Sequence, residues 1–277
     1  MSGVPDPLYV AARTALLDAL EAIGRHRDAV VLVGAQAVYV RAGTSELAVA
    51  AYTTDADLAI DPTSLGPEPL LEEMLGTAGF SRSPLDVGAW SKDVPVEGVP
   101  RRIVVDLLVP ETLGGPGRRG ARIPPHGKLT ARKVIGIEGA LVDRDFHTIG
   151  ALDSSDSRAY DVNVAGPAAL LVAKVFKISE RRADTDRLSD KDALDVLRLL
   201  QATPTTDMAQ RVAVLLANPV SQAVTAEGLG RLPELFGSRT AHGSVMAARA
   251  ARGLEREETI VASVAALAQD LLEALES

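Results

Sequence analysis

The hydrophobic pattern of the chain changes near Gly166–Pro167, and this change limits its fold more than any other sequence feature. Before it, short apolar runs bounded by Gly, Pro and polar residues are typical of buried strands that alternate with helices. After it, strand-like runs vanish, and Ala and Leu recur with helical spacing to the end of the chain. We therefore expect an α/β (α+β) fold, with a mixed sheet flanked by helices over residues 1–165 and a helical domain over residues 166–277.

Hydrophobic periodicity places the individual elements. The N-terminal part is expected to hold strands at 29–33, 52–60 and 101–109, with shorter strands within 132–151 and at 158–164. Its helices are expected at 7–24, from 34 to about 41, and at 68–79. In the C-terminal part we expect helices at 167–182, 189–202, 206–217, 220–228 and 254–275.

Composition excludes several classes of protein. Hydrophobic residues make up 47 % and charged residues 24 %, which is too apolar for an intrinsically disordered chain. There is no apolar run of about 18 residues and no signal-peptide pattern at the N-terminus. Cysteine is absent, which excludes disulfides, thiolate metal sites and a cysteine nucleophile. We expect a cytoplasmic protein without a membrane partner.

The charge balance limits the kind of polyanion that the chain can bind. The formal net charge is −8, which argues against a general nucleic-acid coat, and no DNA partner is expected. A local basic cleft remains compatible with an acidic protein. The stretch from Arg118 to Lys133 holds six basic residues and no acid, and it is either an RNA-contacting loop or a solvated loop.

Two aspartates stand two residues apart on the predicted strand 52–60. Because side chains at i and i+2 point to the same face of a strand, Asp55 and Asp57 place two carboxylates side by side. Such a pair either caps a strand end in solvent or binds a hard divalent cation such as Mg²⁺.

A third carboxylate, Asp106, lies inside the apolar strand 101–109. Burying a charge there without a partner is costly, so Asp106 either faces solvent from an edge strand or has a partner. If this strand lies beside the strand of Asp55 and Asp57, the three carboxylates converge. Three carboxylates around two metal ions suit nucleotidyl transfer.

The strand 29–33 runs into the turn Gly34-Ala35-Gln36, and a helix follows. Backbone N–H groups at the start of such a helix can cradle a phosphate. The same sequence is also typical of tight strand–helix packing without any ligand.

Charged residues also recur along the predicted helices 167–182 and 189–202. Lys174, Lys177 and Arg181 share one face of the first helix, which is either a solvated stripe or a basic face for a triphosphate or a nucleic-acid end. Asp192 and Asp195 share a face of the second helix, where they either complement the helix dipole or orient those basic residues.

Taken in order, these pieces resemble the nucleotidyltransferase fold. The Gly34-Ala35 turn followed by Thr53-Thr54-Asp55-Ala56-Asp57-Leu58 is similar to its signature. Pro167, Lys174, Arg181-Arg182 and the run Lys191-Asp192-Ala-Leu-Asp195 resemble the later motifs of the AbiEii-type nucleotidyltransferase toxins. The similarity spans roughly residues 28–200.

The resemblance implies a role for each matched residue. Asp55 and Asp57 would bind Mg²⁺ and the nucleoside triphosphate, and Asp106 would supply the third carboxylate. The triphosphate would be held by the turn and by the basic helix. The implied nucleotide-binding residues beside Lys174 are Gly34, Ala35, Gln36, Lys177, Arg181, Arg182, Lys191, Asp192 and Asp195.

The resemblance further implies an enzyme that moves a nucleoside monophosphate to an acceptor. The acceptor would be a tRNA 3′ end, and the protein would be a toxin with a cognate antitoxin. Two departures from the family pattern are Ala35 at the second turn position and Ala50-Ala51-Tyr52 where an Arg is common. The alternatives are a catalytically degenerate nucleotide- or partner-binding protein and a transferase that modifies proteins.

Overall fold

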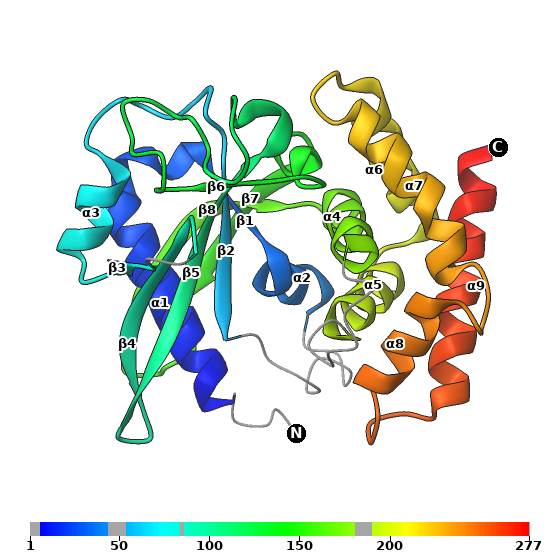
Figure 1. The fold of residues 1–277 in the computed structure, drawn as a ribbon. Coiled ribbons are helices and arrows are strands. Elements are labelled where there is room, and N and C mark those ends of the chain that lie inside the picture. The colour runs from blue at the N-terminus through cyan, green and yellow to red at the C-terminus, as the bar shows by residue number, and fades with distance from the viewer. Residues whose placement is uncertain (1–5, 44–53, 84–85, 181–189, 277) are drawn as a thin grey trace. The chain divides into compact units, whose positions relative to one another are not determined.

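The fold is described from a computed structural model, which covers residues 6–43, 54–83, 86–180 and 190–276 (Figure 1). The chain forms two compact units. The first consists of Met1–Gln36, Tyr52–Val134 and Asp145–Val164, and the second of Ala37–Ala51, Ile135–Arg144 and Ala165–Ser277. The division into domains at residue 165 stays a prediction.

The first unit is built on a mixed sheet with the strand order β3-β4-β5-β2-β1-β8-β7, and β6 pairs with β5. β1 is antiparallel to β2 and parallel to β8, whereas β5 is parallel to β2 and antiparallel to β4. The strands are β1 (Val30–Val33), β2 (Asp55–Ile60), β3 (Ser81–Arg82), β4 (Ala89–Val96), β5 (Val99–Pro110), β6 (Arg132–Val134), β7 (Arg144–Gly150) and β8 (Ala159–Ala165).

Helix α1 (Pro7–Ile23) covers one face of this sheet and packs against β2, β4 and β5. Its first turn is closed by Asp6, whose carboxylate accepts hydrogen bonds from two backbone N–H groups. Its fully buried side chains recur with helical spacing, as expected for an amphipathic helix. The other helical segments that begin here are α2 (Gly34–Ala42), α3 (Leu71–Thr77), and the 3-10 helices η1 (Gly24–Ala29) and η3 (Glu111–Leu113).

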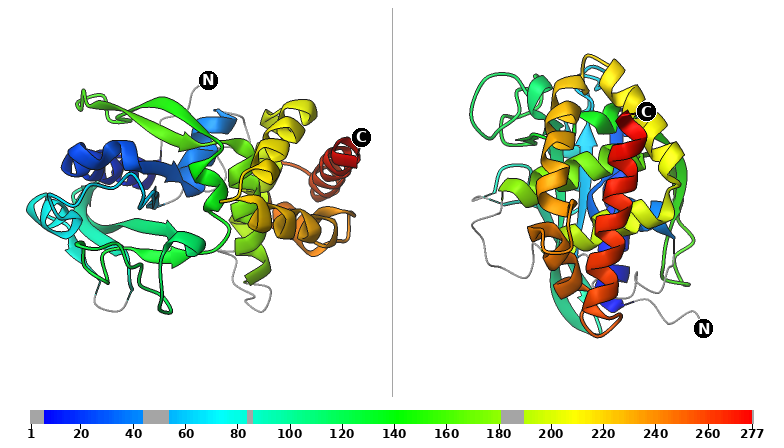
Figure 2. Two further views of the ribbon diagram at one scale, coloured as in Figure 1. Left: turned by 90° about the horizontal axis from the view of Figure 1, so that it is seen from above. Right: turned by 90° about the vertical axis from the view of Figure 1, so that its right-hand side faces the viewer.

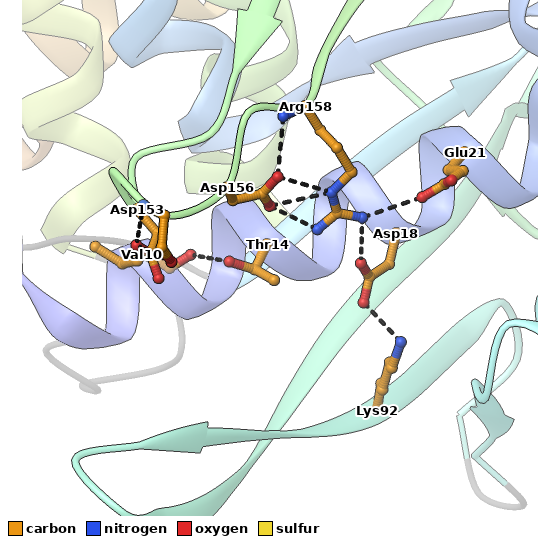
Figure 3. A network of polar contacts seen from close by, with 9 residues as sticks. Val10, Thr14, Asp18, Glu21, Lys92, Asp153, Asp156 and Arg158 are labelled. Carbon is orange, nitrogen blue, oxygen red and sulfur yellow. Dashed lines mark hydrogen bonds and ion pairs between the residues drawn. The ribbon is translucent and has the colours of Figure 1, made fainter.

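A network of ion pairs fixes α1 to its neighbours in the first unit (Figure 3). Asp18 on α1 accepts hydrogen bonds from Lys92 on β4 at 2.6 Å and from Arg158 at 2.7 Å. Arg158 also binds Asp156 and Glu21. The hydrogen bond from Arg158 lowers the pKa of Asp156 below its ordinary value. α1 is therefore held to β4 and to the segment before β8 by polar contacts as well as by its apolar face.

The two faces of strand β5 differ in burial over residues 103–107. Ile103, Val105 and Leu107 are buried, whereas Val104 and Asp106 between them are partly exposed. Because residues alternate between the two faces of a strand, the buried set lies on the side of α1 and the partly exposed set on the opposite side.

The second unit is a set of packed helices (Figures 1 and 2). α4 packs against α5, α6 and α7, and α9 packs against α5, α6, α7 and α8. Phe176 on α4 is buried among Val172 and Val224. The helices are α4 (Pro167–Glu180), α5 (Asp190–Ala202), α6 (Thr205–Ala217), α7 (Gln222–Phe236), α8 (His242–Ala250) and α9 (Glu257–Glu276), with η4 (Glu138–Leu141) packed against α4.

The expected α/β fold class is confirmed, but the sequence patterns did not predict β3, β4 or α8. β4 is polar and contains Pro95, so it lacks the apolar run typical of a strand. It pairs with β5 through a tight turn at Glu97-Gly98, where both residues have positive φ. α8 follows a segment rich in Gly and Ser that obscures its helical period. No helix among the described residues is long and apolar enough to cross a membrane.

Candidate functional site

Three aspartates lie on the polar face of two neighbouring strands. β2 and β5 are parallel, and Asp57 on β2 is the register partner of Asp106 on β5. Asp55, two residues earlier on β2, lies on the same face and is the register partner of Val104. Asp55 is exposed and Asp57 is partly buried. The structure thus brings the three carboxylates of this carboxylate row (Asp55, Asp57, Asp106) to one face, as the strand pattern predicted.

Asp106 has a cationic partner on the neighbouring strand. Arg132 on β6, which pairs with β5, donates a hydrogen bond from Nη2 to Asp106 Oδ2 at 3.0 Å. The Asp106 side chain is 19 % exposed. Within the described ranges, no three His, Cys, Asp or Glu side chains come close enough together to hold a metal ion.

Asp57 lies directly against the glycine turn. Val33, the last residue of β1, is its register partner, and Gly34 follows with a φ of +69°. A Cβ atom at residue 34 would lie 2.0 Å from Asp57 Oδ2, so only glycine fits there. Among the described residues, none donates a hydrogen bond to the Asp57 carboxylate. The first turn of α2 and a partly buried carboxylate therefore approach each other closely.

This set of donors fits Mg²⁺. The ion prefers carboxylate oxygens and is commonly held by one or two carboxylates together with substrate phosphates and water. Asp55 and Asp57 supply two such carboxylates on one face, and the start of α2 supplies N–H groups for phosphate beside them. The absence of a Cβ at Gly34 lets Asp57 Oδ2 lie directly against the backbone at the start of α2.

The buried Gln36 side chain connects the glycine turn to β2. Its side chain is 1 % exposed, accepts a hydrogen bond from Arg13 Nε at 3.0 Å and donates one to the backbone oxygen of Asp55 at 3.2 Å. Arg13 in turn donates to the backbone oxygen of Gly150. The Gln36 side chain therefore ties the start of α2 to the start of β2, while Ala35 is partly exposed beside it.

The second unit holds a different arrangement, the lysine cluster (Lys174, Lys177, Asp192, Asp195 and Arg198). Lys174 is 4 % exposed, and its Nζ donates to Asp192 Oδ1 at 2.6 Å and to Asp195 Oδ2 at 2.7 Å. Arg198 donates to the other oxygen of Asp195 at 2.7 Å. Lys177 lies 3.2 Å from Asp192 Oδ1, and its side chain is 43 % exposed. The cluster thus joins α4 to α5 through buried charges.

Electrostatics keep this cluster ionised. Burial by itself lowers the pKa of Lys174, but the carboxylates of Asp192 and Asp195 outweigh it and raise the pKa above its ordinary value. Burial likewise raises the pKa of Asp192, and Lys174 and Lys177 reverse this effect, so that its pKa lies below the ordinary value. Lys174 therefore carries its positive charge at neutral pH although it is buried.

The remaining predicted nucleotide-binding residues lie on α5 or outside the described part. Lys191 is partly exposed at the start of α5, whereas Arg181 and Arg182 lie outside the described residues. Sequence reasoning did not pair Arg132 with Asp106, because their contact spans 26 positions and depends on strand pairing. It also missed Arg198, although the spacing of three residues from Asp195 on one helix indicates that pair.

Comparison with known proteins gives one match. A family model described as a nucleotidyltransferase matches residues 12–225. No curated protein and no solved structure matches the chain. The matched residues include both the carboxylate row and the lysine cluster.

Proposed function

Because the chain belongs to a nucleotidyltransferase family, we propose that it transfers a nucleoside monophosphate from a nucleoside triphosphate to an acceptor with the help of Mg²⁺. One observation carries this proposal. Asp57 is partly buried, lies against the glycine turn and accepts no hydrogen bond from a described residue, while Asp55 shares its face of β2. A carboxylate kept in this state is available to a cation.

In the proposed reaction, Asp55 and Asp57 would hold Mg²⁺, which would neutralise the triphosphate and stabilise the charge of the transition state. The backbone N–H groups at Gly34 and Ala35 orient the phosphates. The acceptor hydroxyl oxygen bonds to the α-phosphorus as the bond to the bridging oxygen breaks and pyrophosphate leaves. The proton of the hydroxyl passes to a carboxylate of the row.

The family resemblance suggests that basic residues of α4 and α5 bind the triphosphate. Lys177 supports this assignment because its side chain is 43 % exposed while it lies 3.2 Å from Asp192. Asp192 and Asp195 act as positioning residues that hold Lys174. Arg181, Arg182 and Lys191 complete the proposed set, on the strength of the family resemblance.

The resemblance to AbiEii-type toxins suggests the acceptor and the biological role. We propose a tRNA 3′ end as the acceptor, and a toxin that a cognate antitoxin neutralises. The test is to incubate the protein with each labelled nucleoside triphosphate and Mg²⁺, once with total RNA and once with a protein extract. Label in an RNA band supports this acceptor, whereas label in a protein band replaces it with protein modification.

A second candidate is a degenerate member that binds a nucleotide or a partner protein without transfer. The ion pair between Arg132 and Asp106 favours this alternative, because it occupies one carboxylate of the row. Ala35 in the glycine turn also departs from the family pattern. Transfer of label to any acceptor, lost in an Asp57→Asn variant, would exclude this alternative.

A further inference from the structure

A polar cavity lies on the same face of the sheet as the carboxylate row. It has a volume of about 490 Å³ and is lined by residues of β4, β5 and β6 and of the segments before them. Val104 and Asp106, the register partners of Asp55 and Asp57, both contribute to its wall. Asp106 therefore belongs both to the carboxylate row and to the wall of the cavity. Its size is in the range of ligand-binding cavities.

The cavity is basic although the chain is acidic. Its charged lining residues are Arg102, Arg119, Arg132, Lys133, Asp86 and Asp106, so cations outnumber carboxylates by four to two, against a net charge of −8 for the whole chain. Concentrating like charges costs free energy unless an anion is bound. A region of this sign in an acidic protein points to an anionic ligand.

Two of these cations have unused binding capacity. Arg132 Nε is buried and has no hydrogen-bond partner, although the same guanidinium binds Asp106. In the part of the chain that the structure describes, no carboxylate pairs with Arg119. A guanidinium presents several donors in a plane that matches the oxygens of a phosphate, so both side chains suit this ligand.

Backbone hydrogen bonds hold the cavity wall in place. The N–H of Lys133 donates to the backbone oxygen of Arg119 at 2.7 Å, and Gly120 forms a bridge to Arg132. The N–H of Ala121 donates to the oxygen of Ala131 at 2.9 Å. The backbone of the basic segment that contains Arg119 is thus tied to β6 before any ligand binds, which lowers the entropic cost of ordering this wall on binding.

The strand order places this cavity on one side of the proposed metal ligands. Along the order β4-β5-β2-β1, the glycine turn follows β1 on one side of Asp57, and the cavity lies over β5 and β4 on the other. In-line transfer needs the attacking and the leaving oxygen on opposite sides of the phosphorus. If the turn holds the triphosphate, the cavity lies on the side of the attacking acceptor.

We propose that this cavity binds the backbone phosphates of a single-stranded nucleic acid, as the acceptor subsite of the transfer; the assignment to the acceptor rests on the proposed function. The described lining residues include no aromatic side chain, so the bases are not held by stacking. Binding through phosphates has weak sequence preference and steep salt dependence.

The test uses two double variants with equal charge changes. Arg102→Gln with Arg119→Gln removes two cations from the cavity. Arg101→Gln with Arg118→Gln removes the adjacent cations, which are exposed and do not line it. Binding of a short fluorescein-labelled single-stranded RNA is measured by anisotropy over a range of salt concentrations, without Mg²⁺ or nucleotide, and thermal melting checks that both variants fold.

The cavity variant should bind the RNA more weakly, and the slope of log K against log salt should fall by about 0.7 for each lost phosphate contact on a single strand. The control variant should keep the slope of the parent protein. Equal losses in the two variants, or no RNA binding by the parent protein, would overturn the proposal.

Two further measurements distinguish the phosphates of RNA from those of the nucleoside triphosphate as the ligand of the cavity. If binding of a fluorescent nucleoside triphosphate with Mg²⁺ falls in the cavity variant while RNA binding does not, the cavity holds the triphosphate and the acceptor assignment is wrong. Asp57→Asn should abolish transfer and leave RNA binding intact. RNA binding that depends on the cavity, together with transfer that survives Asp57→Asn, would overturn the proposed function and leave the phosphate site standing.

Discussion

The carboxylate row and the lysine cluster use the same kind of side chain in opposite ways. Asp195 is 1 % exposed and binds two cations, whereas Asp57 is partly buried and accepts no hydrogen bond from a described residue. A buried pair is costly to break because one charge is then left without a partner. A carboxylate without a donor gives up stability and remains available for a ligand. The lysine cluster thus holds helices together, whereas Asp57 in the carboxylate row is available to a cation.

The largest expected effect is on the row. Asp57→Asn should reduce nucleotidyl transfer about ten-thousandfold, because a metal ligand supplies several kcal/mol of transition-state stabilisation. The melting temperature should stay the same or rise, since no hydrogen bond within the described residues is lost. Transfer of labelled nucleotide and thermal melting check both outcomes. Asp270→Asn, which changes an exposed aspartate on α9, is the control and should retain full activity.

The same type of change in the cluster should affect stability first. Lys174→Met leaves Asp192 and Asp195 buried with fewer cations, and should lower the free energy of unfolding by about 3 kcal/mol or more. Lys177→Met removes a cation from the same helix whose side chain is 43 % exposed, and should cost about 1 kcal/mol or less. Urea unfolding measures both. Equal small losses would mean that the buried pair is not what holds α4 to α5.

A third prediction concerns the close approach at the glycine turn. Gly34→Ala introduces a Cβ atom at positive φ and against Asp57, whereas Gly43→Ala introduces one at a φ of +66° with nothing within 4 Å. Backbone strain alone costs about 1–3 kcal/mol at each position. Gly34→Ala should therefore destabilise more than Gly43→Ala, and only Gly34→Ala should impair transfer. Identical losses in stability and activity would show that Asp57 does not depend on this contact.

The smallest expected effect is a dependence on pH. The pKa of Asp192 is depressed below 3.8, so its contribution to stability is present above pH 3.8 and is lost as the pH falls through its folded-state value. In Lys174→Met the buried carboxylate instead gains stability on protonation. The gap in unfolding free energy between the two proteins should narrow as the pH falls from neutral to below 3.8. A gap that widens in acid would contradict the assigned ion pair.

Between neutral pH and pH 10.5, the difference in unfolding free energy between the parent protein and Lys174→Met should stay constant. The pKa of Lys174 is raised above 10.5, so its contribution is complete below pH 10.5 and is lost only as the pH rises through the higher folded-state value. Urea unfolding of both proteins at several pH values tests the two ends of this profile in one series.

Local patterns in the sequence predicted the parts of the site that lie within one element. The spacing of Asp55 and Asp57 indicates one strand face without any knowledge of the fold. The register of Asp57 with Asp106 and the ion pair to Arg132 depend on which strands pair, which no local pattern specifies. The sequence indicated the basic stretch around Arg119 but left its role open, because the cavity forms only when β4, β5 and β6 come together.

Burial was the hardest property to predict. Lys174 and Lys177 are three residues apart on one helix, yet one is 4 % exposed and the other is partly exposed. Their spacing predicts a shared face, and only the packing of α5 on α4 decides which lysine is enclosed. The polar strand β4 escaped prediction because Ser91, which lines the cavity, and the polar residues Lys92 and Asp93 interrupt its apolar positions.

Metal binding shows directly whether the aspartates of β2 hold a divalent cation for nucleotidyl transfer. Mn²⁺ as a probe for Mg²⁺ is titrated into the protein with a non-hydrolysable nucleoside triphosphate, and bound metal is followed by electron paramagnetic resonance. The parent protein and Asp270→Asn, which changes an exposed aspartate on α9, should bind Mn²⁺, whereas Asp55→Asn and Asp57→Asn should bind it far more weakly. Undiminished Mn²⁺ binding by both aspartate variants would show that Asp55 and Asp57 are not the metal ligands.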